Sequence, residues 1–231
     1  MTRALERGAL LFFYRPRVGV ERVRGLGDVQ RFFLVLAPDS KRLFRRLIVG
    51  RKRLPDPAAH EREWAFVAEV ATDPEAIRDD LQRFEYRTRT RGTRVQREAQ
   101  GAGSAVYVVV EHDGHTHLAY ALDAPGDPDR LQRELGIRRE ASYIAAVRNP
   151  EAPAPPGAGL GTGRRAELPR ALQARFAGRR FAPLDPPDFL DHGGVELVLI
   201  GAAEDASREL GIDLHPERER RAGADLLATL R

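Results

Sequence analysis

The stretch Val106–Leu122, VYVVVEHDGHTHLAYAL, places two apolar runs on either side of Asp113-Gly114. Asp-Gly between two alternating runs predicts a two-residue β-hairpin turn, because both central residues can take a positive φ. In the register that follows, His112 lies opposite His115. Side chains alternate between the two faces of a strand, so one face of this hairpin is expected to be the core face. Its side chains are those of Tyr107, Val109, Leu118 and Tyr120.

Three histidines, His112, His115 and His117, are expected on the other face of the hairpin. Neutral imidazole is a common ligand of divalent metals such as zinc, and a metal-bound water would supply hydrolytic or lyase chemistry. His112 and His115 flank the turn, where side chains are wet, and no second-shell acceptor can be assigned. The sequence therefore leaves two interpretations open, a metal site and a polar hairpin tip.

Six further strands are predicted from short runs of β-branched and aromatic residues bounded by Gly, Pro or Asp. They join the two hairpin strands, Ala105–Val110 and His117–Leu122, in what is expected to be a largely antiparallel sheet. The six are Ala9–Tyr14, Phe32–Leu36, Phe44–Val49, Trp64–Val70, Ser142–Val147 and Val195–Ile200.

Four short helices are expected between and after these strands. Asp73-Pro74 and Asp127-Pro128 each offer an Asp at the N-cap and a Pro at the first helical position. Leu168–Phe176 and Pro216–Leu230 have the apolar spacing of amphipathic helices. The fold class predicted from these elements is α+β, with the helices covering one face of the sheet.

The segments Ala65–Leu81 and Ala119–Leu135 align without a gap, and each reads strand, turn and Asp-Pro helix start. Duplication of a β–β–α unit is one explanation of this likeness. The alternative is that any strand followed by an Asp-Pro helix start looks alike, because the chemistry of helix capping converges.

The clearest break in the chain is NPEAPAPPGAGLGTG, residues 149–163, which is rich first in proline and then in glycine. It predicts a core domain of residues 1–149, a linker of residues 150–163 and a C-terminal α/β segment of residues 164–231. That segment is short for independent stability, so its strand Val195–Ile200 is expected to join or pack on the core.

The composition narrows the range of functions. The 231 residues are 42% hydrophobic, enough for a sizeable core, and include no cysteine, which excludes disulfides, thiolate metal sites and a cysteine nucleophile. No apolar run approaches the ~18 residues of a membrane span. The first such run, residues 9–14, lacks the cleavage site of a signal peptide, so a cytoplasmic location is expected and no membrane partner.

Three familiar motifs are tested and fail. The glycine-rich run Gly157–Gly163 lacks the glycine spacing of a dinucleotide loop and follows a proline-rich segment instead of a strand. A Walker loop fails because neither of the two lysines follows a glycine. Gly103-Ser104 has no glycine two residues after the serine, so it is not a nucleophile elbow.

Arginine supplies nearly all of the positive charge, and the formal net charge is +4. It gathers in three patches, residues 41–53, 86–94 and 175–181. Guanidinium groups bind phosphates through paired hydrogen bonds. The third patch interleaves arginine with phenylalanine, whose ring can stack on a base. The partner suggested by these patches is a nucleic acid or another polyanion, although no nucleic-acid-binding motif is present. The candidate anion-binding residues are Arg51, Lys52, Arg53, Arg87, Arg89 and Arg91.

The sequence leaves three functions open and does not settle whether the protein is an enzyme. The first is a non-enzymatic binding or interaction protein, because every catalytic motif tested fails. The second is a metal-dependent enzyme that uses the three histidines. The third is a binder of nucleic acid or of a phosphate-bearing ligand that uses the arginine patches. Oligomeric state is not predicted.

Overall fold

The hairpin at Asp113-Gly114 forms as predicted in the computed structural model of the protein, which describes residues 2–88, 92–153 and 165–214. Asp113 and Gly114 take φ values of 47° and 81°. His112 pairs with His115, and Val110 pairs with His117. The predicted core face is also confirmed, because all four of its side chains belong to the main hydrophobic core: Tyr107, Val109, Leu118 and Tyr120.

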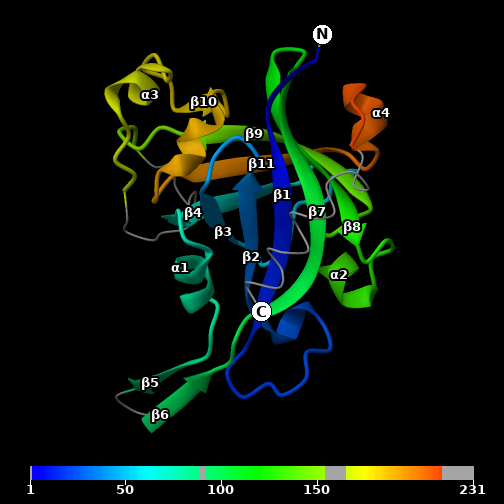
Figure 1. The fold of residues 1–231 in the computed structure, drawn as a ribbon, viewed down its shortest axis with the longest axis vertical. Helices are drawn as coiled ribbons and strands as arrows, with labels where there is room; N and C mark the ends of the chain where they lie inside the picture. Colours follow the sequence, from blue (N-terminus) through cyan, green and yellow to red (C-terminus); the bar gives the residue numbers. More distant parts are fainter. Residues whose placement is uncertain (1, 89–91, 154–164, 215–231) are drawn as a thin grey trace.

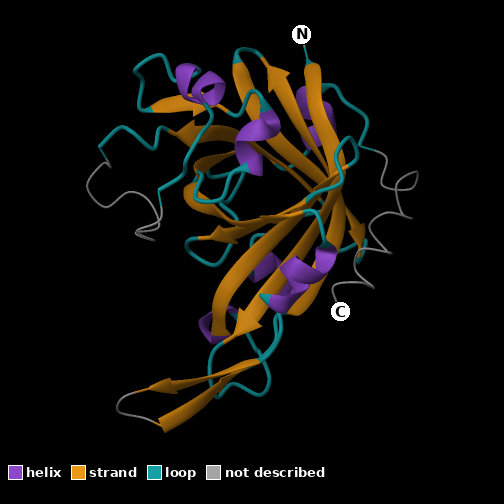
Figure 2. Ribbon diagram, turned by 60° about the vertical axis from the view of Figure 1, so that its left-hand side comes forward, coloured by secondary structure: helices purple, strands orange, loops and turns teal. Residues whose placement is uncertain are grey.

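Eight strands close into an antiparallel barrel (Figure 1, Figure 2). They are β1 (Arg3–Pro16), β2 (Val29–Pro38), β3 (Phe44–Val49), β4 (Arg62–Ala71), β7 (Gln100–His112), β8 (His115–Ala124), β9 (Glu140–Arg148) and β11 (Glu196–Ala203). Their order is β9-β11-β4-β3-β2-β1-β7-β8, and the pairing of β8 with β9 completes the circle. Seven of these strands each contain one of the strands predicted from the sequence, and β11 overlaps the eighth, Val195–Ile200, which was predicted to begin one residue earlier.

The remaining elements are short. β5 (Phe84–Thr88) and β6 (Gly92–Gln96) form a separate two-stranded hairpin, and β10 (Phe181–Pro183) pairs with β9. The α-helices are α1 (Pro74–Asp79), α2 (Arg130–Glu134), α3 (Arg170–Ala174) and α4 (Ala206–Leu210), and two 3-10 turns are η1 (Leu26–Asp28) and η2 (Pro187–Asp191). The helix predicted at Pro216–Leu230 lies outside the described residues.

The predicted α+β fold, a sheet with helices over one face, is wrong. The sheet closes on itself, so one of its faces is the barrel interior and its few short helices lie at different places outside. The prediction assumed that one face of the sheet is polar, but β7 and β8 are apolar on both faces. Their outer side chains Val108 and Val110 pack beneath α4, while the inner ones fill the barrel. Alternation along single strands cannot reveal which two strands will pair last.

Aromatic side chains fill the barrel interior. The ring of Phe12 lies 5.3 Å from that of Tyr120 and 6.3 Å from that of Phe32. Tyr120 in turn stacks on Tyr143 at 6.4 Å, and all four side chains are almost completely buried. An eight-stranded barrel is just wide enough for side chains to fill. The interior is therefore a packed core.

The two Asp-Pro segments differ in structure. Asp73 caps α1 as predicted, but the N-cap of α2 is Asp129, whose carboxylate accepts the backbone N–H of Gln132, so the predicted cap at Asp127 is wrong. The Asp129 N–H in turn donates to the side-chain oxygen of Gln132, and this capping box outweighs the Asp-Pro signal. α1 packs on the outside of the barrel and α2 against the main core. The two helices therefore begin at non-equivalent positions of the aligned segments and pack on different sides of the sheet, which does not support a duplicated β–β–α unit.

The chain after the proline-rich break returns to the barrel. β11 lies between β4 and β9 and pairs with both, which confirms the expectation that the strand at Val195–Ile200 joins the core. Residues 154–164, most of the predicted linker, lie outside the described ranges. The barrel therefore needs strands from both sides of that segment.

Candidate nucleic-acid interface

The β5–β6 hairpin leaves the barrel and extends away from it (Figure 1, Figure 2). Its register pairs Phe84 with Gln96 and Tyr86 with Arg94, so these four side chains share one face. The other face carries Glu85 and Arg87 from β5 and Thr93 and Val95 from β6. The two faces are chemically different: we call the first the aromatic face and the second the charged face.

The aromatic face holds the two large hydrophobic side chains that the described residues expose. Phe84 is 50% exposed and Tyr86 is 39% exposed, and their ring centroids lie 6.0 Å apart with a tilt of 41°. Elsewhere in the described chain the large apolar side chains are buried or half-buried. A pair of exposed rings on a projecting arm is a feature of interaction sites.

Arginines surround these rings. Residues 82–97 contain six arginines and one glutamate. In the described part of the chain, Arg83 pairs with that glutamate, Glu85, whereas Arg87 and Arg94 have no carboxylate within ion-pair distance. Arg87 lies on the strand that the alternating sequence predicted. The other two residues predicted with it, Arg89 and Arg91, lie outside the described residues.

A buried arginine of β1 holds the base of the hairpin. The Arg15 guanidinium donates from Nη1 to the carbonyls of Gln82 and Arg97, at 3.1 and 3.0 Å, and from Nη2 to the carbonyl of Asp80, at 2.6 Å. Its Cζ also lies 5.3 Å from the ring centroid of Phe84, within cation–π distance. Because Gln82 and Arg97 flank the two strands, Arg15 fixes both ends of the hairpin to the barrel.

The opposite side of the hairpin base is a shallow depression of about 470 Å³. Arg97 donates from Nη1 to the carbonyl of Glu21 at 2.6 Å, which ties the hairpin to the loop between β1 and β2. The depression is lined by Gly19, Val20, Glu21, Arg83, Val95, Arg97 and Glu98. Burial, followed by the nearby charge of Arg46, lowers the pKa of Arg15.

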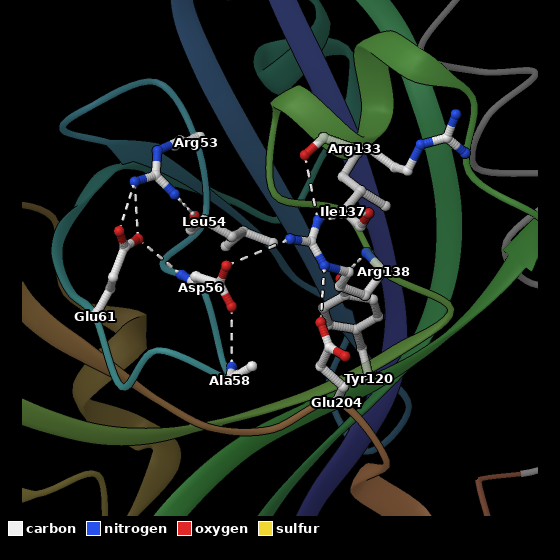
Figure 3. Close-up of polar contacts among 10 residues, drawn as sticks. All are labelled: Arg53, Leu54, Asp56, Ala58, Glu61, Tyr120, Arg133, Ile137, Arg138 and Glu204. Atoms are coloured by element: carbon white, nitrogen blue, oxygen red, sulfur yellow. Dashed lines mark hydrogen bonds and ion pairs between the residues drawn. The ribbon is translucent and has the colours of Figure 1, made fainter.

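The predicted anion-binding residues 51–53 lie far from this hairpin in the sequence and form contacts within the protein, of which Figure 3 shows those of Arg53. Arg53 donates to Glu61 at 2.9 Å and Lys52 to the Val29 carbonyl at 2.9 Å. Arg51 lies 3.4 Å from the Glu63 carboxylate but is 70% exposed. Arg53 therefore organises the loop between β3 and β4, and its charge is already matched.

Figure 3 also shows how this loop is joined to the end of the barrel where β9 begins. Arg138 donates from Nε to Glu204 at 3.2 Å and lies 3.8 Å from the Asp56 carboxylate, and its backbone N–H donates to the Tyr120 hydroxyl at 2.9 Å. Burial raises the pKa of Tyr120 to about 12. The loop lies close on β11, where a Cβ on Gly201 would come within 2.3 Å of the Asp56 carbonyl oxygen.

The other end of the barrel holds a buried ion network that the sequence did not reveal. Arg45, which is fully buried, donates to both carboxylate oxygens of Glu6, at 2.6 and 2.9 Å, and from Nε to Asp191 at 2.7 Å. The Tyr107 hydroxyl donates to Glu6 at 2.8 Å. Burial, followed by the charge of Glu6, raises the pKa of Tyr107. Arg45 belongs to the first arginine patch, which alternation alone would place at a surface.

The third patch also turns inward. Phe176 is fully buried in the core and packs on Phe189 at 5.5 Å, while Phe181 lies 6.2 Å from Trp64. Next to it is an open depression of about 690 Å³, whose three carboxylates Asp185, Asp188 and Asp191 are each paired with lysine or arginine. In the described chain, neither the first patch (residues 41–53) nor the third (residues 175–181) therefore combines exposed aromatic rings with unpaired arginines, as the hairpin does.

The three histidines share one face but not one environment. His115 is exposed, His112 is half-buried and His117 is buried beneath α4. The Thr2 hydroxyl donates its only proton to the Leu210 carbonyl at 2.7 Å, so His112 Nδ1, 2.8 Å away, donates to Thr2. Within the described ranges, no group of three or more His, Asp or Glu side chains is placed to hold a metal ion. The metal site therefore stays a prediction.

Burial lowers the pKa of His117, with the charge of Glu209 acting against it and those of His112 and His115 adding to it. The unfolded chain binds a proton at His117 near pH 6.5, whereas the folded chain binds one only at lower pH. The contribution of His117 to the free energy of unfolding is therefore fully present above about pH 6.5. It decreases as the pH falls below that value, by no more than about 1.4 kcal/mol per pH unit.

We therefore expect the free energy of unfolding to fall more between about pH 7.5 and about pH 5.5 in the wild type than in His117→Gln. Urea denaturation of both proteins at the two pH values measures the difference. The same pH dependence in both proteins would show that His117 titrates alike in the folded and unfolded chains.

None of the helices in the described ranges is long and apolar enough to cross a lipid bilayer. No protein-family model, curated protein or solved structure matches the chain, so its function has to be inferred from its own residues.

Proposed function

We propose that the chain is a non-enzymatic nucleic-acid-binding protein that holds its ligand on the β5–β6 hairpin. The observation that carries this proposal is the pair of exposed rings, Phe84 and Tyr86, set among arginines on an arm that leaves the barrel. Nucleic acids carry both groups that such an arm can bind, phosphates for guanidinium groups and bases for aromatic rings. An acidic protein would match the charge but does not present a regular series of planar bases to the two rings.

The rest of the molecule supports a binding role. The barrel interior is filled by aromatic side chains, and ion networks lie at both of its ends. The barrel is therefore a rigid scaffold, and the hairpin presents a surface instead of an enclosed pocket. We also propose that the protein acts in the cytoplasm, in keeping with a chain that has no cysteine for disulfide bonds.

The phosphate contacts are tested by removing charge from the hairpin. The variant R87Q/R94Q removes the two arginines of the described parts of β5 and β6, neither of which has a carboxylate partner in the described chain. Each phosphate contact releases counterions, so the slope of log K against log salt for single-stranded DNA is expected to become less steep by about 1.4. Fluorescence anisotropy with a labelled oligonucleotide of about 20 bases, between about 50 and 200 mM salt, measures this slope.

The matched control is R170Q/R208Q. It removes the same charge from exposed positions of α3 and α4, at the far end of the molecule from the hairpin (Figure 1). We expect this control to keep the wild-type slope. Equal loss of affinity in both variants would show that binding depends only on the net charge of the protein and not on the hairpin. No binding by the wild type at the lowest salt would overturn the proposed function.

A further inference from the structure

We infer that the hairpin selects single-stranded nucleic acid and stacks two successive bases on Phe84 and Tyr86. This inference rests on the proposed function and names the form of nucleic acid that the site takes. Phe84 and Tyr86 stand two residues apart on one strand, a repeat of about 6.6 Å, and both rings are open to solvent. In a duplex each base is already stacked between its neighbours, so only unpaired bases can use these ring faces.

The position of Phe84 argues against a duplex-bound wedge. Side chains that enter between base pairs must reach into a groove ahead of the rest of the protein. Phe84 instead lies at the base of the hairpin, where the Arg15 guanidinium contacts its ring at 5.3 Å. It is thus close to the barrel wall and presents an accessible face only to a strand thin enough to lie along the hairpin.

The same contact prepares the aromatic face for stacking. Arg15 is almost completely buried and is held by three backbone carbonyls, so the ring it touches is fixed before any ligand arrives. A ring that is already ordered loses little conformational entropy when a base stacks on it. Arg94 lies directly opposite Tyr86 on the same face, where it can bind the phosphate that joins the two stacked nucleotides.

The two faces of the hairpin provide an internal control. The described part of the charged face carries Arg87 but neither of the exposed aromatic side chains, so it attracts phosphates of single strands and duplexes alike. Removing the rings should therefore change the preference between the two forms, whereas removing Arg87 should change the affinity for both.

The experiment compares the wild type with F84A/Y86A and R87Q, using a mixed-sequence DNA strand of about 20 bases and the duplex of that strand. We expect the wild type to bind the strand more tightly than the duplex. F84A/Y86A should weaken binding to the strand about 30-fold or more and leave binding to the duplex within about two-fold. R87Q should weaken both by similar factors. The variant Y86F, which keeps the ring, should bind the strand as the wild type does.

Each other result is informative. If F84A/Y86A weakens binding to strand and duplex equally, or if the wild type prefers the duplex, the single-strand inference is overturned while nucleic-acid binding stands. If the wild type binds neither, the proposed function itself fails. Because alanine at Phe84 also removes the contact with Arg15, F84L/Y86L provides a second test. Leucine retains apolar bulk without a ring, so normal binding of the strand by this variant would likewise overturn stacking.

Discussion

Arg45→Met is expected to lower the free energy of unfolding by about 3–5 kcal/mol. The Arg45 guanidinium is completely buried and binds Glu6 and Asp191. Without it, Glu6 becomes a buried carboxylate whose nearest remaining partner is the Tyr107 hydroxyl. Removal of one member of a buried ion pair is costly mainly because the other member is left uncompensated.

Urea denaturation of Arg45→Met, E6Q and the double variant measures this effect. In the double variant both charges are gone, so its loss of stability should be smaller than the sum of the two single losses. Arg42→Met is the matched control, because Arg42 is exposed in the loop just before β3 and its loss should cost no more than about 0.5 kcal/mol. A similar loss in Arg42→Met and Arg45→Met would contradict the role given to the buried network.

Arg15→Met is expected to release the base of the β5–β6 hairpin and to lower the free energy of local opening of that hairpin by about 3 kcal/mol or more. Three carbonyls, those of Asp80, Gln82 and Arg97, lose a charged donor, and hydrogen bonds to charged groups contribute about 1.5–3 kcal/mol each. The loss is local, so amide hydrogen exchange should speed up in β5 and β6 more than in the barrel strands. Binding of single-stranded DNA should fall as well, because Phe84 loses its support.

Arg31 provides the control for this experiment. It lies opposite Arg15 on the neighbouring strand β2 and is exposed, so Arg31→Met removes the same charge without removing those three hydrogen bonds. Hydrogen exchange in β5 and β6 should stay at the wild-type rate in Arg31→Met. If Arg15→Met leaves that exchange unchanged too, the hairpin is held by other contacts, such as the bond from Gln96 to the Pro16 carbonyl.

Local sequence patterns were sufficient to predict where the strands of the barrel lie in the chain. Asp113-Gly114 determined both the turn and the register of β7 and β8, because a two-residue turn leaves one way to align its strands. Barrel closure could not be predicted in this way. It depends on the pairing of β8 with β9 and on the insertion of β11, contacts between segments that no local pattern relates.

The candidate site was predicted in part. The alternation of arginine after Tyr86 indicated a cationic strand, and Arg87 lies on β5. Phe84 was missed because an exposed phenylalanine has no local signature, and other phenylalanines near arginine, such as Phe176, are buried. Arg45 was missed for the opposite reason, since a buried arginine is recognised only when its partner Glu6, on another strand, is known.

The insertion of β11 between β4 and β9 has a consequence for the synthesis of the protein. As the chain leaves the ribosome, the strands up to β9 emerge first, and until residues 196–203 follow, β4 and β9 each have an edge without its final partner. Unpaired strand edges are the sites at which nascent chains associate with one another. A pause in translation between β9 and β11 would lengthen the time for which the edges of β4 and β9 can associate with other chains. The time needed to translate the proline-rich segment therefore affects how much of the nascent protein aggregates.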